Sequence, residues 1–431
     1  MAQKHFRLLD LPPELVGHVY SYLEDDFYSK RPACRALLPY TRRNRFRVVN
    51  LSKSTPILSF LDFFGCGLSC LEWKEPTEPS PLVQDLALLV KELYVGAIRG
   101  VFDADETARR IARAVSFMRN ITKAEVGDQA VLSEVLRLGK RGGFGRLEEL
   151  KVDIESVVTA DLFDSDHLGT LSSFPALERL TLDLEFLMVQ PMSSSTHDYP
   201  SVPHLTTLHI KQWGPFANSE PVHIFVSRLL NLQSFSLELT TDSNPSRLLE
   251  CLPSTLRSLC VAYYPELDSA ELATNVDAVI PRFTTLHSLT LGVALFSQSS
   301  AFYDLLQTHL PSLRTFEITN YELFEVNTAN LIPFVRARGG PAGQLKRVVI
   351  DTVCGGPYGG MGYQEALELE EVTQEAGVEL GGSIRAALQV ENEREWAEYY
   401  LYQRSSGMSH EDAVALCDGP TSEDEDEEEE E

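Results

Sequence analysis

The sequence has no long uninterrupted run of apolar residues. Its longest apolar runs, such as residues 86–90, are far shorter than the roughly 20 residues that a membrane-spanning helix needs. The first fifteen residues, MAQKHFRLLDLPPEL, contain no apolar stretch of the kind found in secretory signals. We therefore expect a chain that is neither secreted nor membrane-spanning and that has no membrane partner.

Basic residues are scarce relative to acidic ones. The chain holds 37 Lys and Arg against 63 Asp and Glu, a formal net charge of -26 at pH 7. Because this charge repels phosphate backbones, we do not expect a nucleic-acid partner. Residues 423–431 are nine consecutive acids, which repel one another and are expected to be disordered. Residues 1–51 differ from the rest, with nine basic and five acidic side chains.

Motifs for catalysis, metal binding and nucleotide binding are missing. The seven cysteines include no CxxC pair, and the ten histidines include no HExxH pattern. The glycine-rich residues 354–362 lack the lysine of a phosphate-binding loop and lead into an acidic helical pattern, which favours a connector over a nucleotide site. We therefore expect no catalytic residue, metal, cofactor or enzyme activity. A hydrolase or nucleotide-dependent enzyme using this loop is the weakest alternative. Scattered cysteines indicate reduced thiols of a cytoplasmic or nuclear protein.

The sequence does contain an internal repeat. The six-residue pattern LxxLxL, with conservative apolar replacements, occurs at least twelve times at spacings of 22 to 32 residues. The clear copies begin at Leu147, Leu177, Leu205, Leu232, Leu256, Leu286 and Leu313. The weaker copies begin at Phe46, Leu68, Val90, Ile121 and Leu345. This regularity predicts stacked copies of one structural unit.

Each copy predicts a short strand, and several intervening segments predict a helix. The fourth and sixth positions of a copy are apolar between polar neighbours, which directs both side chains to one face of a strand. Helical spacing with start signals occurs at residues 221–229, 245–252, 300–310 and 330–335. One strand and one helix per copy predict a curved α/β solenoid with strands on its concave face. An ordinary α/β domain with amphipathic strands is the alternative.

The pattern resembles the leucine-rich-repeat family over about residues 46–353. The resemblance implies an α/β leucine-rich-repeat solenoid, with short parallel strands on the concave face and helices outside. Many members place Asn or Cys at the ninth position of a copy, whereas this chain has residues such as Glu155 and Trp213 there. We therefore expect irregular turns without an asparagine ladder.

Three regions follow from this organisation. Residues 1–45 form a small helical segment, and residues 46–390 form the solenoid, including the glycine-rich loop at 354–362. Residues 391–431 combine a C-terminal capping helix, at about 391–403, with the acidic tail. Residues 378–380 are expected to add a last irregular strand.

The N-terminal segment carries a second pattern. Residues 8–23 read LLDLPPELVGHVYSYL, in which two prolines suit a first helical turn and the apolar residues that follow form one helix face. A second helix is expected from about Pro32. Two or three helices in about 40 residues are too few to bury this apolar face alone, so they need a partner.

This segment resembles the F-box family on Leu11, Pro12, Glu14, Leu15, Val19 and Leu23, followed by CRALLPYTRR at residues 34–43. The resemblance implies docking onto the small adaptor subunit of cullin-RING ubiquitin ligases, with the repeats capturing protein substrates. The chain would then be a substrate-recognition subunit. Adaptor contacts are expected from Leu11, Pro12, Glu14, Leu15, Val16, Val19, Tyr20, Leu23, Leu37 and Leu38. The alternative is a leucine-rich-repeat interaction scaffold whose N-terminal helices only cap the solenoid.

Candidate target-binding residues lie on and beside the central strands. The third and fifth positions of these copies are mostly small and polar, and aromatic residues fall just past the strand ends. A polar floor with aromatic rims suits recognition of another protein, because Trp and Tyr supply much of the binding energy of interfaces. The candidates are Arg179, His209, Trp213, Tyr263, Tyr264 and Tyr321. The alternative, that the aromatic residues fill irregular turns, stays open.

Overall fold

The computed structural model describes residues 46–52, 54–69, 72–73, 78–96, 98, 103–153, 171–183, 202–213, 220–239, 245–263, 276–320, 326–341, 343–352, 362–390 and 394. The chain divides into two compact units, residues 1–258 (unit 1) and 259–431 (unit 2). The predicted N-terminal helices, nearly all of the glycine-rich loop and of the helix at 391–403, and the acidic tail lie outside the described residues.

Unit 1 is built on parallel strands that follow one another in sequence order. These are β1 (Val48–Leu51), β4 (Glu92–Val95), β5 (Lys123–Val126), β6 (Glu149–Asp153), β7 (Arg179–Asp183), β8 (Thr207–Trp213) and β9 (Ser234–Leu239). The fourth position of each copy pairs with the fourth position of the next, so that Leu150 lies opposite Ala124 on one side and Leu180 on the other. All three side chains are buried, as the alternation of apolar residues predicts.

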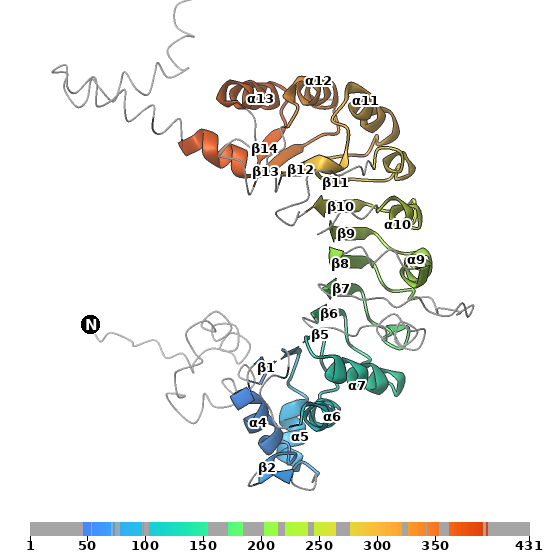
Figure 1. Ribbon diagram of the computed structural model, residues 1–431, viewed down its shortest axis with the longest axis vertical. Helices are drawn as coiled ribbons and strands as arrows, with labels where there is room; N and C mark the ends of the chain where they lie inside the picture. Colours follow the sequence, from blue (N-terminus) through green and yellow to red (C-terminus); the bar gives the residue numbers. More distant parts are fainter. Residues whose placement is uncertain are drawn as a thin grey trace, which may run out of the picture. The chain divides into compact units, whose positions relative to one another are not determined.

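Helices cover one face of these strands (Figure 1). They are α4 (Ser54–Phe63), α5 (Pro81–Ala87), α6 (Ala104–Val115), α7 (Gln129–Lys140), α9 (Glu220–Ser227) and α10 (Ser246–Glu250). In α7, the side chain of Asp128 caps the helix by accepting hydrogen bonds from the amides of Ala130 and Val131 at 3.0 and 3.1 Å. The apolar stripe of α7, from Val131 to Leu136, is then buried.

One predicted repeat strand is wrong. The copy at Leu68 forms β2 (Leu68–Ser69) and β3 (Glu72–Trp73), an antiparallel pair separate from the parallel strands. Leu68 pairs with Trp73, so the first and last positions of this copy face each other. The copy therefore hydrogen-bonds with itself, and β1 pairs directly with β4.

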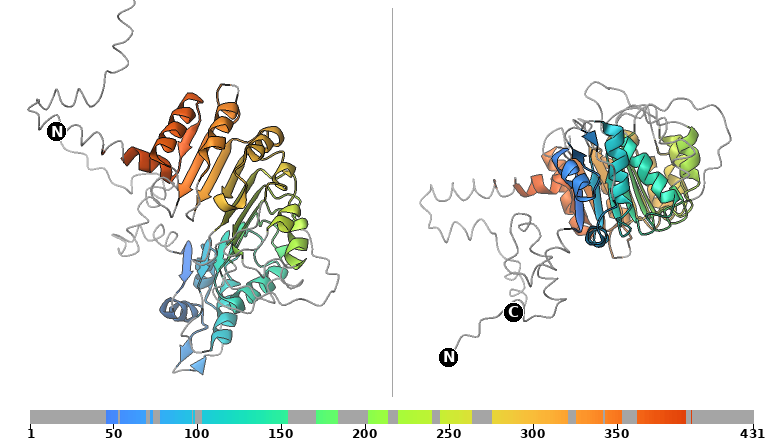
Figure 2. Two further views of the ribbon diagram at one scale, coloured as in Figure 1. Left: turned by 45° about the horizontal axis from the view of Figure 1, so that its top comes forward. Right: turned by 90° about the horizontal axis from the view of Figure 1, so that it is seen from below.

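Unit 2 repeats the same architecture in a shorter array. Its strands, in order, are β10 (Ser258–Tyr263, beginning at the boundary), β11 (Ser288–Gly292), β12 (Thr315–Asn320), β13 (Arg347–Thr352) and β14 (Glu379–Gly381). Its helices are η5 (Ile280–Arg282), η6 (Val293–Leu295), α11 (Ser300–His309), α12 (Thr328–Arg338) and α13 (Tyr363–Glu375), and Figure 2 shows α11–α13 along one side of the strands. The predicted helices at 300–310 and 330–335 and the predicted last strand are thus confirmed.

An aromatic cluster forms the core of unit 2. Phe316 of β12 packs edge-on against Tyr303 of α11 and Phe334 of α12, with ring centroids 6.3 and 5.9 Å apart. Phe296 and Phe302 extend this cluster. Short parallel strands on one face and helices on the other make each unit an α/β leucine-rich-repeat solenoid. None of the described helices is long and apolar enough to cross a membrane.

Candidate protein-binding face

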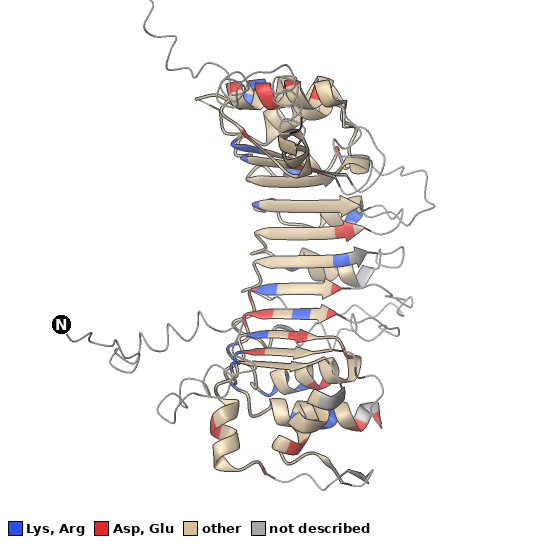
Figure 3. Cartoon of the chain, turned by 90° about the vertical axis from the view of Figure 1, so that its left-hand side faces the viewer, with Lys and Arg blue, Asp and Glu red and all other residues tan. Residues whose placement is uncertain are grey.

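The strands of unit 1 present a polar face opposite the helices. In β6, Leu150 and Val152 point into the core, whereas Glu149, Lys151 and Asp153 remain partly exposed on the other face. The same alternation holds in β4, β5, β7 and β9. Lys, Arg, Asp and Glu therefore occur on several neighbouring strands, as the coloured segments of Figure 3 show. We call the outward residues of β4–β9 the strand face.

Glu149 links three neighbouring strands at one end of the strand face. Its carboxylate pairs with Lys123 of β5 at 2.8 Å and with Arg179 of β7 at 3.1 Å. Partial burial alone would raise the pKa of Glu149, but the hydrogen bonds to Lys123 and Arg179 outweigh burial and lower the pKa below its ordinary value. Because β4–β7 are in register, Glu92, Lys123, Glu149 and Arg179 alternate in charge along the strand face. Arg47, directly before β1, extends this row through a 3.8 Å contact with Glu92.

Lys151 centres a second group of ion pairs. Its Nζ donates to Glu125 Oε1 of β5 at 2.8 Å and to Asp153 Oδ2 at 2.9 Å. Burial alone would lower the pKa of this ammonium, but the two carboxylates outweigh burial and raise the pKa. Lys151 therefore stays charged at neutral pH, and its position between two strands is fixed. We call this group, together with the row through Glu149, the ion-pair ladder.

The strand face is less charged at β8 and β9. Thr207, Ser234 and Ser236 are small, polar and partly exposed. His209 of β8 and Glu238 of β9 form a pair, with Nε2 and Oε1 2.9 Å apart. Burial alone would raise the pKa of Glu238, but the hydrogen bond with His209 outweighs burial and lowers the pKa. This region offers hydroxyl groups that a partner chain can reach without breaking the ladder.

The candidate target-binding residues do not form one cluster. Arg179 and His209 both lie on the strand face, on adjacent strands; Arg179 is held in an ion pair with Glu149, and His209 in a hydrogen bond with Glu238. Trp213 is the last residue of β8, next to a break in the register with β9, and its side chain lies outside the described residues. Tyr263 is buried in β10 with 3% exposure, so it is not part of an exposed rim. Tyr264 and Tyr321 lie outside the described residues.

The ten predicted adaptor contacts all lie within residues 1–45, outside the described residues. The ion-pair ladder, in contrast, is a feature that the sequence analysis missed. Most of its members occupy the third or fifth position of the copies at Val90, Ile121, Leu147 and Leu177, and the exceptions are Arg47 and Asp153. Opposite charges at matching positions of successive copies were the signal that could have revealed it.

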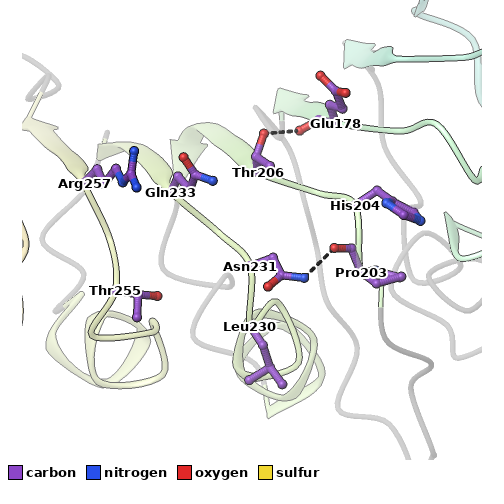
Figure 4. Close-up of a pocket in the computed structure, with 9 residues that line it drawn as sticks. All are labelled: Glu178, Pro203, His204, Thr206, Leu230, Asn231, Gln233, Thr255 and Arg257. Carbon is purple, nitrogen blue, oxygen red and sulfur yellow. Dashed lines mark hydrogen bonds between the residues drawn. The ribbon is translucent and has the colours of Figure 1, made fainter.

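A pocket of about 550 Å³ opens at the edge where β7–β9 begin (Figure 4). Asn231 Nδ2 donates to the carbonyl of Pro203 at 2.7 Å, and Thr206 Oγ1 donates to the carbonyl of Glu178 at 3.3 Å. The remaining lining residues are His204, Leu230, Gln233, Thr255 and Arg257. Leu230 is 72% exposed, the highest value among the described large apolar side chains. The pocket combines an apolar side chain with charged and amide groups, which suits contact with a protein side chain.

Within the described part of the chain, no group of three or more His, Cys, Asp and Glu side chains is placed to hold a metal ion. The strand face itself offers hydrogen-bonding groups and charged side chains on neighbouring strands.

Comparison with known proteins gives weak structural similarities and no family. No protein-family model matches the sequence, and no curated protein is significantly similar to it. Among solved structures, the leucine-rich repeat-containing protein LegL7 from Legionella pneumophila is 13% identical with a TM-score of 0.39, and the match covers 70% of this chain and 95% of that one. A protein from Bacteroides fragilis is 16% identical with a TM-score of 0.32, covering 62% and 66%. A chain of the Rad7 and Elc1 complex in yeast is 13% identical with a TM-score of 0.36, covering 87% and 91%. Structural similarity this weak supports no conclusion about function.

Proposed function

We propose that this chain is a protein-interaction scaffold that captures another protein on the strand face of unit 1. The observation that carries the proposal is the row of partly exposed polar side chains on successive parallel strands, from Glu92 to Glu238. Stacked strands give an extended surface of fixed spacing, about 4.8 Å per strand, which suits contact with a polypeptide. The ion pairs hold the long charged side chains in place before a partner binds, which lowers the entropy lost on binding.

We further propose that the captured protein is a ubiquitination substrate and that residues 1–45 dock on the adaptor of a cullin-RING ligase. The support is the F-box-like pattern, with Leu15, Val19 and Leu23 on one face of an expected helix. In this role the chain has no active site of its own. It contributes proximity, because it holds the substrate near a ubiquitin-charged enzyme that other subunits recruit.

Two substitutions test the adaptor-docking step. Leu15→Asp with Val19→Asp should abolish co-purification of the adaptor and the cullin from cell lysate, because each buried apolar side chain is worth about 1.5–3 kcal/mol. The matched control is Leu82→Asp on α5, where an apolar side chain is 57% exposed. This control should keep the adaptor bound.

Continued co-purification of the adaptor with the double variant would refute docking through this face. If the double variant instead lowered the melting temperature of unit 1 and the wild-type chain bound no adaptor, the N-terminal helices would be a cap. The chain would then be a scaffold outside the ubiquitin ligase.

A further inference from the structure

A row of basic residues lies at the edge of unit 2 where its strands begin. His287, Arg314 and Lys346 each occupy the second position of a copy, directly before β11, β12 and β13. Backbone hydrogen bonds join them in that order: the Arg314 amide donates to the His287 carbonyl at 2.8 Å, and the Lys346 amide donates to the Arg314 carbonyl at 2.8 Å. Arg347 follows as the first residue of β13. We call these four residues the basic strip.

The charges of the basic strip are accessible and little neutralised. Arg314 and Lys346 are exposed, and neither forms an ion pair with another described residue. The ammonium of Lys346 donates only to the carbonyl of Gly343, at 3.2 Å. Arg347 pairs with Glu379 at 3.6 Å, and both side chains are about half exposed. An exposed pair at this distance contributes little, so the strip can accept further carboxylates.

This strip belongs to a protein whose formal net charge is -26. The densest source of that charge is the run of nine acids at residues 423–431, which belongs to the same unit by sequence. Thirty-two residues separate residue 390 from residue 423. A chain of that length can span up to about 110 Å, whereas three neighbouring strands extend over only about 10 Å. The tether is thus long enough for the run to reach the strip.

We propose that residues 423–431 dock on the basic strip of their own chain. Covalent attachment keeps the acids at an effective concentration of about millimolar around unit 2, which favours them over a free acidic peptide at cellular concentration. Flexible Lys and Arg side chains can meet carboxylates at several spacings, so no single register is required. Docking covers the edge of β11–β13 and is released by salt, because exposed charges are screened.

The test is the rate at which an amine-acylating reagent modifies Lys346, followed by mass spectrometry. The full chain is compared with a full-length variant in which all nine acids of residues 423–431 are replaced by Gln or Asn. At 50 mM salt, Lys346 should be modified about threefold more slowly in the native chain, and at 500 mM salt the difference should vanish. Lys140 of α7, which is exposed, is the internal reference and should react equally in both proteins.

Two substitutions and one addition sharpen the test. Arg314→Gln should remove the protection of Lys346, whereas Arg336→Gln, at an exposed position on α12, should keep it. A synthetic peptide of residues 420–431 should restore protection to the neutralised variant. Equal modification rates at 50 mM salt would overturn the proposal. Protection that disappears on dilution of the protein would also overturn it, because the occupant would then be the tail of a second copy.

Discussion

Replacing Glu149 by Gln should destabilise the centre of unit 1 through the loss of two ion pairs. The carboxylate of Glu149 contacts Lys123 on one neighbouring strand and Arg179 on the other, at 2.8 and 3.1 Å. Fully buried charged hydrogen bonds contribute about 1.5–3 kcal/mol each, but exposed pairs contribute only about 0.2–1 kcal/mol. Because these side chains are a quarter to a half exposed, we expect a total loss of about 0.5–1.5 kcal/mol.

Native-state hydrogen exchange of the amides in β5–β7 measures this loss, because it reports the free energy of opening of these strands. The matched control is Glu148→Gln, which removes the same charge one residue earlier, at an exposed position outside the ladder. At 1 M salt the effect of Glu149→Gln should shrink, since the screening length falls to about 3 Å. Equal effects of the two substitutions, or an effect of Glu149→Gln that salt leaves unchanged, would refute the ladder as a stabilising element.

The stability difference between the wild type and the Glu149→Gln variant should also depend on pH. Glu149 has a pKa below the ordinary glutamate value of 4.5, so its charged form is favoured in the folded chain. When folding lowers the pKa of a carboxyl group, the charged form of that group stabilises the folded state. This stabilisation is complete above the unfolded-state pKa and is lost as the pH falls through the folded-state pKa. The difference between wild type and Glu149→Gln should therefore be full at pH 7 and decline below pH 4.5.

Three further outcomes follow from the packing and the strand face. Leu150→Ala, at a side chain with 0% exposure, should lower the free energy of unfolding by about 2–5 kcal/mol in urea titrations, and a loss below 1 kcal/mol would contradict its place in the core. Gly382→Ala should lower the melting temperature more than Gly142→Ala, although both glycines have positive φ. A Cβ added at Gly382 would lie 2.3 Å from a backbone oxygen, whereas a Cβ added at Gly142 would have no atom within 4 Å. Thr207→Arg, at a partly exposed position of β8, should weaken capture of the target protein at least about tenfold in a pull-down without lowering the melting temperature, whereas unchanged capture would remove β8 from the binding face.

The period of the apolar residues predicted most of the described fold. Leu150 and Leu180 stand at the fourth positions of their copies, and they are buried and paired in register as that period requires. The copy at Leu68 has the same pattern but pairs with itself. A hydrophobic pattern specifies which face of a strand is buried, but it does not specify which neighbour supplies the hydrogen bonds.

The binding face was harder to predict than the fold. The small polar residues of β8 and β9 followed directly from their positions in the copies, but the ion-pair ladder depends on residues 26 to 30 positions apart, such as Glu125 and Lys151. Such pairs become visible when the successive copies are aligned and the charges at matching positions are compared. Tyr263 shows the opposite error, because it lies two residues after the buried Val261, and the alternation of β10 itself therefore places its side chain on the core side.

The most direct test of capture on the strand face is site-specific photo-crosslinking in cells. A photoreactive amino acid is placed at Ser236 on β9 or, as the matched control, at Ser227, an exposed serine at the end of α9 on the helical side. The proposal predicts that position 236 crosslinks to a captured protein and that position 227 does not. Crosslinks from position 227 alone, or equally from both positions, would contradict recognition through the strand face.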